Sequence, residues 1–277
     1  MTNNLNMTHD LNQILALLKL PICLKQYQEI AEKSEKDKVS HVAFLYELLL
    51  KESDYRNQKR IDKLVKAAQL PRDKLLSDFD MTRIPGLAPS QVHQLAEGDF
   101  IDRYGNILIF GNPGTGKTHL SIGLAREWCL SGRRVCFYTA AQLVQHLLQA
   151  KAVLRLEQFI KRLDRFEMLI IDDISYVPFE RAETDVLFTL MAARYEMRSL
   201  MITSNLPFSK WGSIFKDEMT TNAAIDRLVH HAVILELNTT SYRSECAQKK
   251  TGGNNKKETA ELSAASEIPS FFSSLPI

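Results

Sequence analysis

The sequence contains few cysteines and no long apolar run. The four cysteines among its 277 residues show no C-x-x-C spacing and no Cys/His cluster with the spacing of a zinc site, which excludes a disulfide scaffold and indicates inert thiols in a reducing compartment. No run approaches the roughly 18 apolar residues of a membrane-spanning helix, and the N-terminus lacks the pattern of a secretory signal. We therefore expect a cytoplasmic protein with no membrane partner.

Neither sign of charge dominates the chain. Lys and Arg total 35 against 33 Asp and Glu, for a formal net charge of +2. This balance does not indicate nucleic-acid binding by itself, although a balanced chain can still gather its basic side chains on one face. Hydrophobic residues make up 45% and charged residues 25%, as in average globular proteins, so the chain should bury a large core.

Glycine is absent between residues 10 and 78, where apolar residues recur at helical spacing. This pattern predicts a small helical bundle with solvated charged faces, which could also serve for docking. Pro-Gly and Ala-Pro steps within residues 82–100 indicate a domain boundary. We predict a helical domain over residues 1–80, an α/β domain over 81–248, and a disordered tail rich in Gly, Asn, Ser and Lys over 249–277.

Apolar strands alternate with amphipathic helices in the α/β domain. Strands separated by helices predict a parallel sheet with helices on both faces. The predicted strands are 106–110, 135–138, 168–171, 200–203 and 233–237, and the predicted helices are 117–131, 140–151, 154–166 and 181–195.

The strongest motif is GNPGTGKT at residues 111–118, which matches G-x-x-x-x-G-K-[ST] between a predicted strand and a predicted helix. The glycines let backbone N–H groups approach phosphate oxygens, Lys117 can reach the β- and γ-phosphates, and the Thr118 hydroxyl can ligate Mg²⁺. The alternative is a glycine-rich turn, but the complete motif in this context favours nucleotide binding. The residues predicted to hold the nucleotide are Gly111, Asn112, Pro113, Gly114, Thr115, Gly116, Lys117, Thr118 and His119.

Two carboxylates follow the apolar strand MLII at residues 168–171. Ligands of open α/β sheets lie at the carboxyl ends of the strands. We predict that Asp172 helps to hold Mg²⁺, with Thr118, and that Asp173 orients or polarises the attacking water. The alternative is a strand that ends in a solvated acidic turn.

Two further polar residues leave alternatives open. Asn205 follows the apolar strand at 200–203 and could hold the lytic water with Asp173, or could be an ordinary turn residue before Pro207. Arg227 could complete the site of a neighbouring subunit in trans. From the residues alone, a surface arginine paired with Asp226 or with a neighbouring acidic residue is the simpler interpretation.

These motifs resemble those of the AAA+ ATPases of the IstB/DnaC clade, and more closely those of the IstB-like helper ATPases of bacterial insertion sequences. The resemblance covers roughly residues 10 to 245 and rests on GNPGTGKTHL, LIIDDISYVPF, AARYE, TSNLPFSKWGSIF, AAIDRLVHHA and TTSYR, together with the N-terminal LALLKLPICLKQY. It implies an α/β fold: a P-loop AAA+ parallel sheet with helices on both faces, preceded by a small all-helical domain, with a truncated lid domain.

The resemblance also implies residue roles. The phosphate loop becomes Walker A, the Asp172-Asp173 pair Walker B and Asn205 sensor 1. Arg227 becomes an arginine finger, in place of the surface arginine favoured above, and Arg243 is similar to a sensor 2 residue that contacts the nucleotide. The predicted catalytic residues are therefore Lys117, Asp173, Asn205 and Arg227.

The resemblance finally implies a function. It predicts an ATP- and Mg²⁺-dependent homo-oligomer, with nucleotide at the subunit interfaces, that assembles on duplex DNA and assists an IstA-like transposase. The helical domain at 1–80 would bind a partner or DNA. Candidate DNA contacts lie in the basic stretch 151–165, including Arg155, Lys161 and Arg162, where a solvated helix face is the alternative. A DnaC-like loader of a replicative helicase and a DNA-architectural protein that binds ATP without useful hydrolysis are the competing hypotheses.

Overall fold

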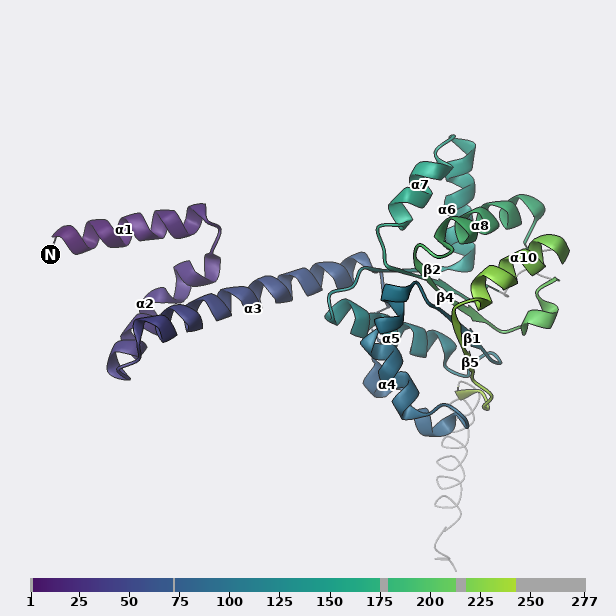
Figure 1. Ribbon diagram of the computed structural model, residues 1–277, viewed down its shortest axis with the longest axis horizontal. Coiled ribbons are helices and arrows are strands. Elements are labelled where there is room, and N and C mark those ends of the chain that lie inside the picture. The colour runs from purple at the N-terminus through teal and green to yellow at the C-terminus, as the bar shows by residue number, and fades with distance from the viewer. Residues whose placement is uncertain (1, 72, 175–178, 213–217, 243–277) are drawn as a thin grey trace, which may run out of the picture.

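The computed structural model describes residues 2–71, 73–174, 179–212 and 218–242 (Figure 1). The predicted tail over 249–277 and Cys246 lie outside these residues. The helices are α1 (Thr2–Leu17), α2 (Pro21–Lys36), α3 (His41–Ala67), α4 (Pro89–Glu97), α5 (Lys117–Leu130), α6 (Ala140–Ala152), α7 (Leu156–Leu163), α8 (Arg181–Arg194) and α10 (Glu218–Val229). The strands are β1 (Asn106–Phe110), β2 (Val135–Thr139), β3 (Met168–Asp172), β4 (Ser199–Ser204) and β5 (Ala232–Glu236).

Within the described residues, the strands form one parallel sheet in the order β2-β3-β4-β1-β5. All the predicted strands are present, and the last begins at Ala232, one residue before its predicted start. The helices predicted between them are also present, with ends shifted by a few residues. The predicted α/β fold is therefore confirmed.

Alternating side chains of the strands build two apolar cores, one on each face of the sheet. In β1, Leu108 and Phe110 join the core beneath α6, α7, α8 and α10. Ile107 and Ile109 join the core beneath α4, α5 and the end of α3, where Trp128 is fully buried. This two-sided burial explains why the strands are apolar without interruption.

The N-terminal helices pack around a small core of their own. Cys23, Ile30 and Leu48 form its buried centre. The buried carboxylate of Glu52 on α3 accepts hydrogen bonds from the backbone N–H groups of Ile22 and Cys23, at 2.8 and 3.1 Å, and so caps the first turn of α2. These helices agree with the predicted helical bundle. None of the helices in the described ranges is long and apolar enough to cross a membrane.

Helix α3 connects these helices to the sheet domain (Figure 1). Its side chains from residue 53 to residue 60 are exposed, whereas Leu64 and Val65 pack against the core under the sheet. The helix ends at Ala67, because the chain turns at Gln69, which has a φ of +55°, and Leu70 enters the core. The helical prediction up to residue 78 was therefore wrong, and the core of the sheet domain begins N-terminal to the boundary predicted after residue 80.

The described cysteines are buried thiols. Cys23, Cys129 and Cys136 are each at most 4% exposed. Burial raises the pKa of Cys129 and of Cys136 to about 11, so both remain protonated at neutral pH. This agrees with the expectation of inert thiols.

Candidate nucleotide site

The phosphate loop lies between β1 and α5, at the carboxyl edge of the sheet. Gly114 and Gly116 have φ angles of +82° and +99°, which L-residues rarely adopt. A Cβ on Gly116 would also stand 2.9 Å from Cε2 of Phe79. The glycines of the motif are therefore required by the shape of the loop, and α5 begins directly after Gly116.

Lys117 is the first residue of α5 and is only 6% exposed. Its ammonium group donates hydrogen bonds to the backbone oxygens of Gly111 and Asn112, at 2.8 and 2.9 Å, and to Oδ1 of Asn205, at 2.5 Å. The two loop carbonyls and the Asn205 side chain, which follows β4, thus hold the ammonium group of Lys117. A triphosphate would replace these oxygens as the hydrogen-bond partners of Lys117.

Thr118, Asp172 and Thr203 form a second group at the same edge. The Thr118 hydroxyl donates to the Asp172 carboxylate, with distances of 3.0 and 3.1 Å to its two oxygens. The Thr203 hydroxyl donates to the same carboxylate at 2.7 Å. Hydroxyl and carboxylate oxygens suit Mg²⁺, so Thr118 and Asp172 fit the metal role predicted for them.

Asp173 and Asn205 contact each other directly. Nδ2 of Asn205 donates to Oδ1 of Asp173 at 2.9 Å. The backbone of Asp173 has a φ of +60°, and its N–H donates to the Thr203 hydroxyl at 2.8 Å. Asn205 therefore links Lys117 to Asp173, and this chain of contacts unites three of the four predicted catalytic residues.

A cavity of about 500 Å³ lies beside the loop. Three segments line it: the phosphate loop with the start of α5, the irregular segment 74–84, and the segment 239–242 after β5. Its lining residues are Lys74, Asp78, Phe79, Asp80, Arg83, Ile84, Gly114, Thr115, Gly116, Lys117, Thr118, His119, Thr239, Thr240 and Tyr242. The cavity therefore continues from the phosphate loop into a space that is lined by both apolar and charged side chains.

Sequence reasoning missed two walls of this cavity. Phe79 is buried against Gly116 and forms an edge contact with His119, at 5.6 Å between ring centroids. The guanidinium of Arg83 lies 4.8 Å from the centre of the Tyr242 ring. This contact connects the segment 74–84 with the segment 239–242, the two lining segments that lie outside the phosphate-loop motif. The Pro-Gly step in this region was interpreted as a boundary signal, and no other local pattern marks these residues.

Arg227 lies on α10, away from this cavity. Its guanidinium donates to the backbone oxygen of Ala223 at 3.0 Å and lies 5.2 Å from the centre of the Phe188 ring on α8. The cavity lining does not include it. The structure therefore does not bring Arg227 together with the other predicted catalytic residues, and Arg243 lies outside the described residues.

The basic stretch 151–165 covers the end of α6 and all of α7. Lys151, Arg155, Lys161 and Arg162 are exposed there. Lys161 pairs with Glu157 at 2.6 Å, and Arg162 lies over the Phe159 ring, so part of this charge is neutralised locally.

A phosphate loop after the inner strand β1, with polar side chains at the ends of β3 and β4, defines a P-loop protein with the AAA+ fold. The fold is similar to that of the replication initiator DnaA bound to AMPPCP and single-stranded DNA, with a TM-score of 0.53 and 20% identity over 68% of this chain and 57% of that chain. It is also similar to DnaI, with a TM-score of 0.52 and 18% identity over 66% of this chain and 98% of that chain. At this identity the likeness shows the fold alone.

Comparison with sequence relatives identifies the family to which the chain belongs within this class of protein. The chain is 41% identical to a Sinorhizobium fredii protein named for an insertion sequence and for ATP binding, over 84% of this chain and 78% of the relative. It is 35% identical to a Pseudomonas aeruginosa protein named for insertion sequence IS21 and ATP binding, over 92% of this chain and 96% of the relative. The family model of the IstB-like ATP-binding proteins matches residues 13–250, and the chain belongs to this family. The resemblance inferred from the motifs is confirmed.

Proposed function

We propose that this protein hydrolyses ATP as an oligomer on duplex DNA and thereby assists the transposase of an insertion sequence in target selection. The observation that carries the proposal is the convergence of Lys117, Thr118, Asp172, Asp173 and Asn205 beside one 500 Å³ cavity. The names of the sequence relatives support ATP as the ligand and an insertion sequence as the context. The same names favour the transposase over a replicative helicase as partner.

The phosphates of ATP fit the loop, and the nucleoside fits the rest of the cavity. Backbone N–H groups of the loop and the N-terminus of α5 attract the anionic phosphates. Lys117 exchanges its contacts with two loop carbonyls for phosphate oxygens. Phe79, Ile84 and Tyr242 then offer apolar and aromatic surface to the base.

Thr118 and Asp172 would hold Mg²⁺, and the two oxygens that already share a hydrogen bond offer the hard ligands this ion prefers. When bound, the ion neutralises charge on the β- and γ-phosphates. Thr203 keeps the Asp172 carboxylate in place from the buried side.

Asp173 is the residue placed to accept a proton from, or to orient, an attacking water. It is half-buried, and the bond from Asn205 fixes the direction of its carboxylate. Oδ1 of Asn205 accepts from Lys117 and Nδ2 donates to Asp173, so the arrival of a γ-phosphate at Lys117 frees the amide oxygen to accept a hydrogen bond from the water. This exchange couples substrate binding to the positioning of the base.

Arg227 supplies positive charge to the nucleotide of a neighbouring subunit. Its position on α10, outside the cavity of its own subunit, supports this role in trans. ATP then favours the oligomer, because the nucleotide contacts two protomers at once. Exposed basic side chains of 151–165 contact the DNA backbone, and this binding should weaken as salt is added.

The test combines ATP turnover, nucleotide binding and the size of the DNA-bound assembly. We expect Lys117→Ala to lose nucleotide binding. Arg227→Ala should keep nucleotide binding but lose most DNA-stimulated turnover and assembly. Lys51→Ala and Arg181→Ala, which remove exposed basic residues on other helices, serve as matched controls. Normal turnover in Lys117→Ala would refute the site, and normal turnover with normal assembly in Arg227→Ala would refute the role in trans.

The partner is tested with the full-length chain. Recovery of the transposase of the same insertion sequence in an ATP-dependent pull-down from defined components supports the proposal. Recovery of a replicative helicase without the transposase would establish the loader instead.

A further inference from the structure

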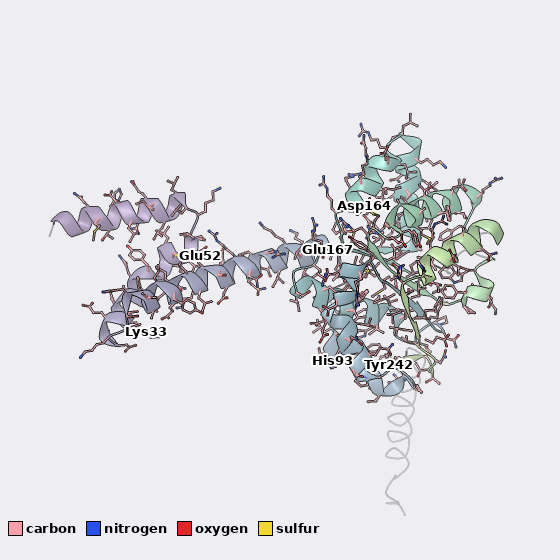
Figure 2. The ribbon with its side chains drawn as sticks, in the orientation of Figure 1. Lys33, Glu52, His93, Asp164, Glu167 and Tyr242 are labelled. Carbon is pink, nitrogen blue, oxygen red and sulfur yellow. The ribbon has the colours of Figure 1, made fainter. Side chains whose placement is uncertain are left out.

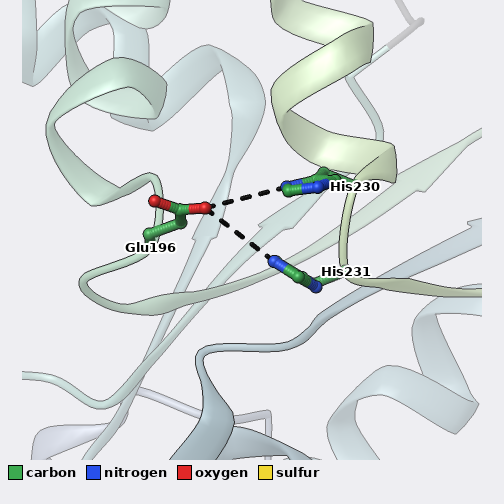
Figure 3. A group of neighbouring side chains, drawn as sticks. All are labelled: Glu196, His230 and His231. Atoms are coloured by element: carbon green, nitrogen blue, oxygen red, sulfur yellow. Dashed lines mark ion pairs between the residues drawn. The ribbon is translucent and has the colours of Figure 1, made fainter.

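A second group of polar side chains lies at the opposite edge of the sheet from the phosphate loop. Glu196 follows α8 and precedes β4, whereas His230 and His231 follow α10 and precede β5 (Figure 3). Because β1, β4 and β5 are parallel, these residues lie at the amino ends of strands whose carboxyl ends approach the nucleotide site. A five-residue strand separates the two edges by roughly 16 Å.

The three side chains converge on one point. Oε1 of Glu196 lies 3.7 Å from Nδ1 of His230 and 3.9 Å from Nε2 of His231. One ligand atom from each residue lies within 4.8 Å of the others, and the two imidazole rings are 4.1 Å apart at their centroids. Each side chain is about half exposed, so water can reach the group from one side.

We propose that Glu196, His230 and His231 form a binding site for a divalent transition-metal ion, with Zn²⁺ as the expected ion. Zinc–ligand bonds of about 2.0–2.1 Å in a tetrahedron place ligand atoms roughly 3.3 Å apart, so the two distances from Glu196 to the histidines need to shorten by only about half an ångström. Two imidazoles and one carboxylate select zinc-like ions over Mg²⁺ or Ca²⁺, which prefer oxygen ligands. Water completes the coordination.

Tyr195 places a hydroxyl next to this group. Its oxygen lies 2.9 Å from Nδ1 of His230, the nitrogen that must face the metal ion. A bound metal ion would displace this hydroxyl from His230, so the hydroxyl competes with the ion for the nitrogen.

A metal ion bound at this site would connect two parts of the sheet domain, the turn after α8 and the end of α10. Glu196 belongs to the turn between α8 and β4, and the histidines follow α10, which carries Arg227. A bound ion would fix the end of α10 to that turn by bonds between side chains. The site stands on its own geometry and does not depend on the proposed ATPase function.

The experiment is a titration of tag-free, chelator-treated, full-length protein. Zn²⁺ binding is measured by calorimetry, and Co²⁺ is added in a parallel titration because its visible absorption reports coordination by nitrogen and oxygen. We expect one equivalent to bind and the midpoint of thermal unfolding to rise in Zn²⁺. Mg²⁺ should produce neither signal.

Substitution of the three proposed metal-binding residues tests whether the metal ion binds at this group. Loss of an outer partner typically weakens metal binding 10–100-fold, so Glu196→Gln, His230→Ala and His231→Ala should each weaken it by more than about 100-fold. His93→Ala removes an exposed histidine on α4 (Figure 2) and should bind as the wild type does. Tyr195→Phe should bind at least as tightly, because it removes the competing hydroxyl.

Several results would overturn the proposal. These are less than one equivalent bound by the wild type, equal binding by the ligand variants, or a loss of binding in His93→Ala as large as in the ligand variants. If Glu196 only forms ionic contacts with the two histidines and the group holds no metal ion, the wild type will bind less than one equivalent.

Discussion

Thr203 is a buried residue that holds both acidic residues of the site, and its substitution gives a sharp test of the geometry. Its hydroxyl donates to Asp172 at 2.7 Å and accepts from the N–H of Asp173 at 2.8 Å, and the side chain is fully buried. Thr203→Val keeps the shape of the side chain but removes both hydrogen bonds. The variant therefore isolates the hydroxyl from the packing of β4.

The magnitude follows from the two bonds. A hydrogen bond to a charged acceptor contributes about 1.5–3 kcal/mol, and a buried N–H left without a partner costs about 1–3 kcal/mol. With partial compensation, we expect the free energy of unfolding to fall by roughly 2–4 kcal/mol and the unfolding midpoint by roughly 5–15 °C. Because the Asp172 carboxylate and the backbone N–H of Asp173 each lose a fixed contact, kcat for ATP should fall about 10–100-fold, which corresponds to about 1.4–2.8 kcal/mol.

The assay measures thermal unfolding and steady-state ATP turnover with duplex DNA present. Thr203→Ser keeps the hydroxyl and should retain most of kcat, although the lost methyl group lowers stability by about 1 kcal/mol. An unfolding midpoint and a kcat for Thr203→Val that both match the wild type would refute the inference that this hydroxyl positions the acidic pair.

Three further predictions concern other parts of the sheet domain. Gly116→Ala should weaken ATP binding in a fluorescence titration and lower stability by about 1–2 kcal/mol, because of its φ of +99° and the ring of Phe79; unchanged affinity would contradict this. Arg194→Met should lower the free energy of unfolding in urea by more than about 3 kcal/mol, because the fully buried guanidinium donates to three backbone oxygens; a change below about 1 kcal/mol would contradict it. Asp102 accepts two hydrogen bonds from Arg133, at 2.7 and 2.8 Å, which lower its pKa below the ordinary 3.8. Since the folded pKa lies below the unfolded one, this stabilisation is present at neutral pH and is lost as the pH falls through the folded pKa. Asp102→Asn should therefore cost about 0.5 kcal/mol in urea unfolding at pH 7, for an exposed pair, and less below pH 3.8; a cost that grows with acid would refute the sign.

The phosphate site could be predicted because its signal is contiguous in the sequence. Residues 111–118 carry their own backbone requirements, and the apolar strand before them fixes their place at the edge of the sheet. Asp172 and Asn205 could be placed near the loop because parallel strands end at the same edge. Local pattern and sheet topology were sufficient for this part.

The rest depends on packing between distant segments. Phe79 reaches Gly116, and Tyr242 reaches Arg83, only after the irregular chain between α3 and α4 and the chain after β5 fold over the loop. Hydrophobic periodicity does not mark such segments. The burial of Arg194 was equally invisible, because a charged residue at the end of an amphipathic helix is usually exposed.

The metal-ligating group was missed for a related reason. The two adjacent histidines were noted only as part of a family motif, and their third partner lies 34 residues earlier (230 − 196), beyond any spacing that defines a local metal motif. The parallel sheet brings the turns before β4 and β5 together, which no local pattern indicates.

Helix α3 has a mechanical consequence for the whole molecule. Its 27 residues span about 40 Å, and only its last turns touch α5 and β2. A tilt of about 5° at this anchored end would swing the far tip by roughly 3.5 Å over such a length. Because α5 begins with the lysine of the phosphate loop, one helix contacts both this arm and the candidate nucleotide site.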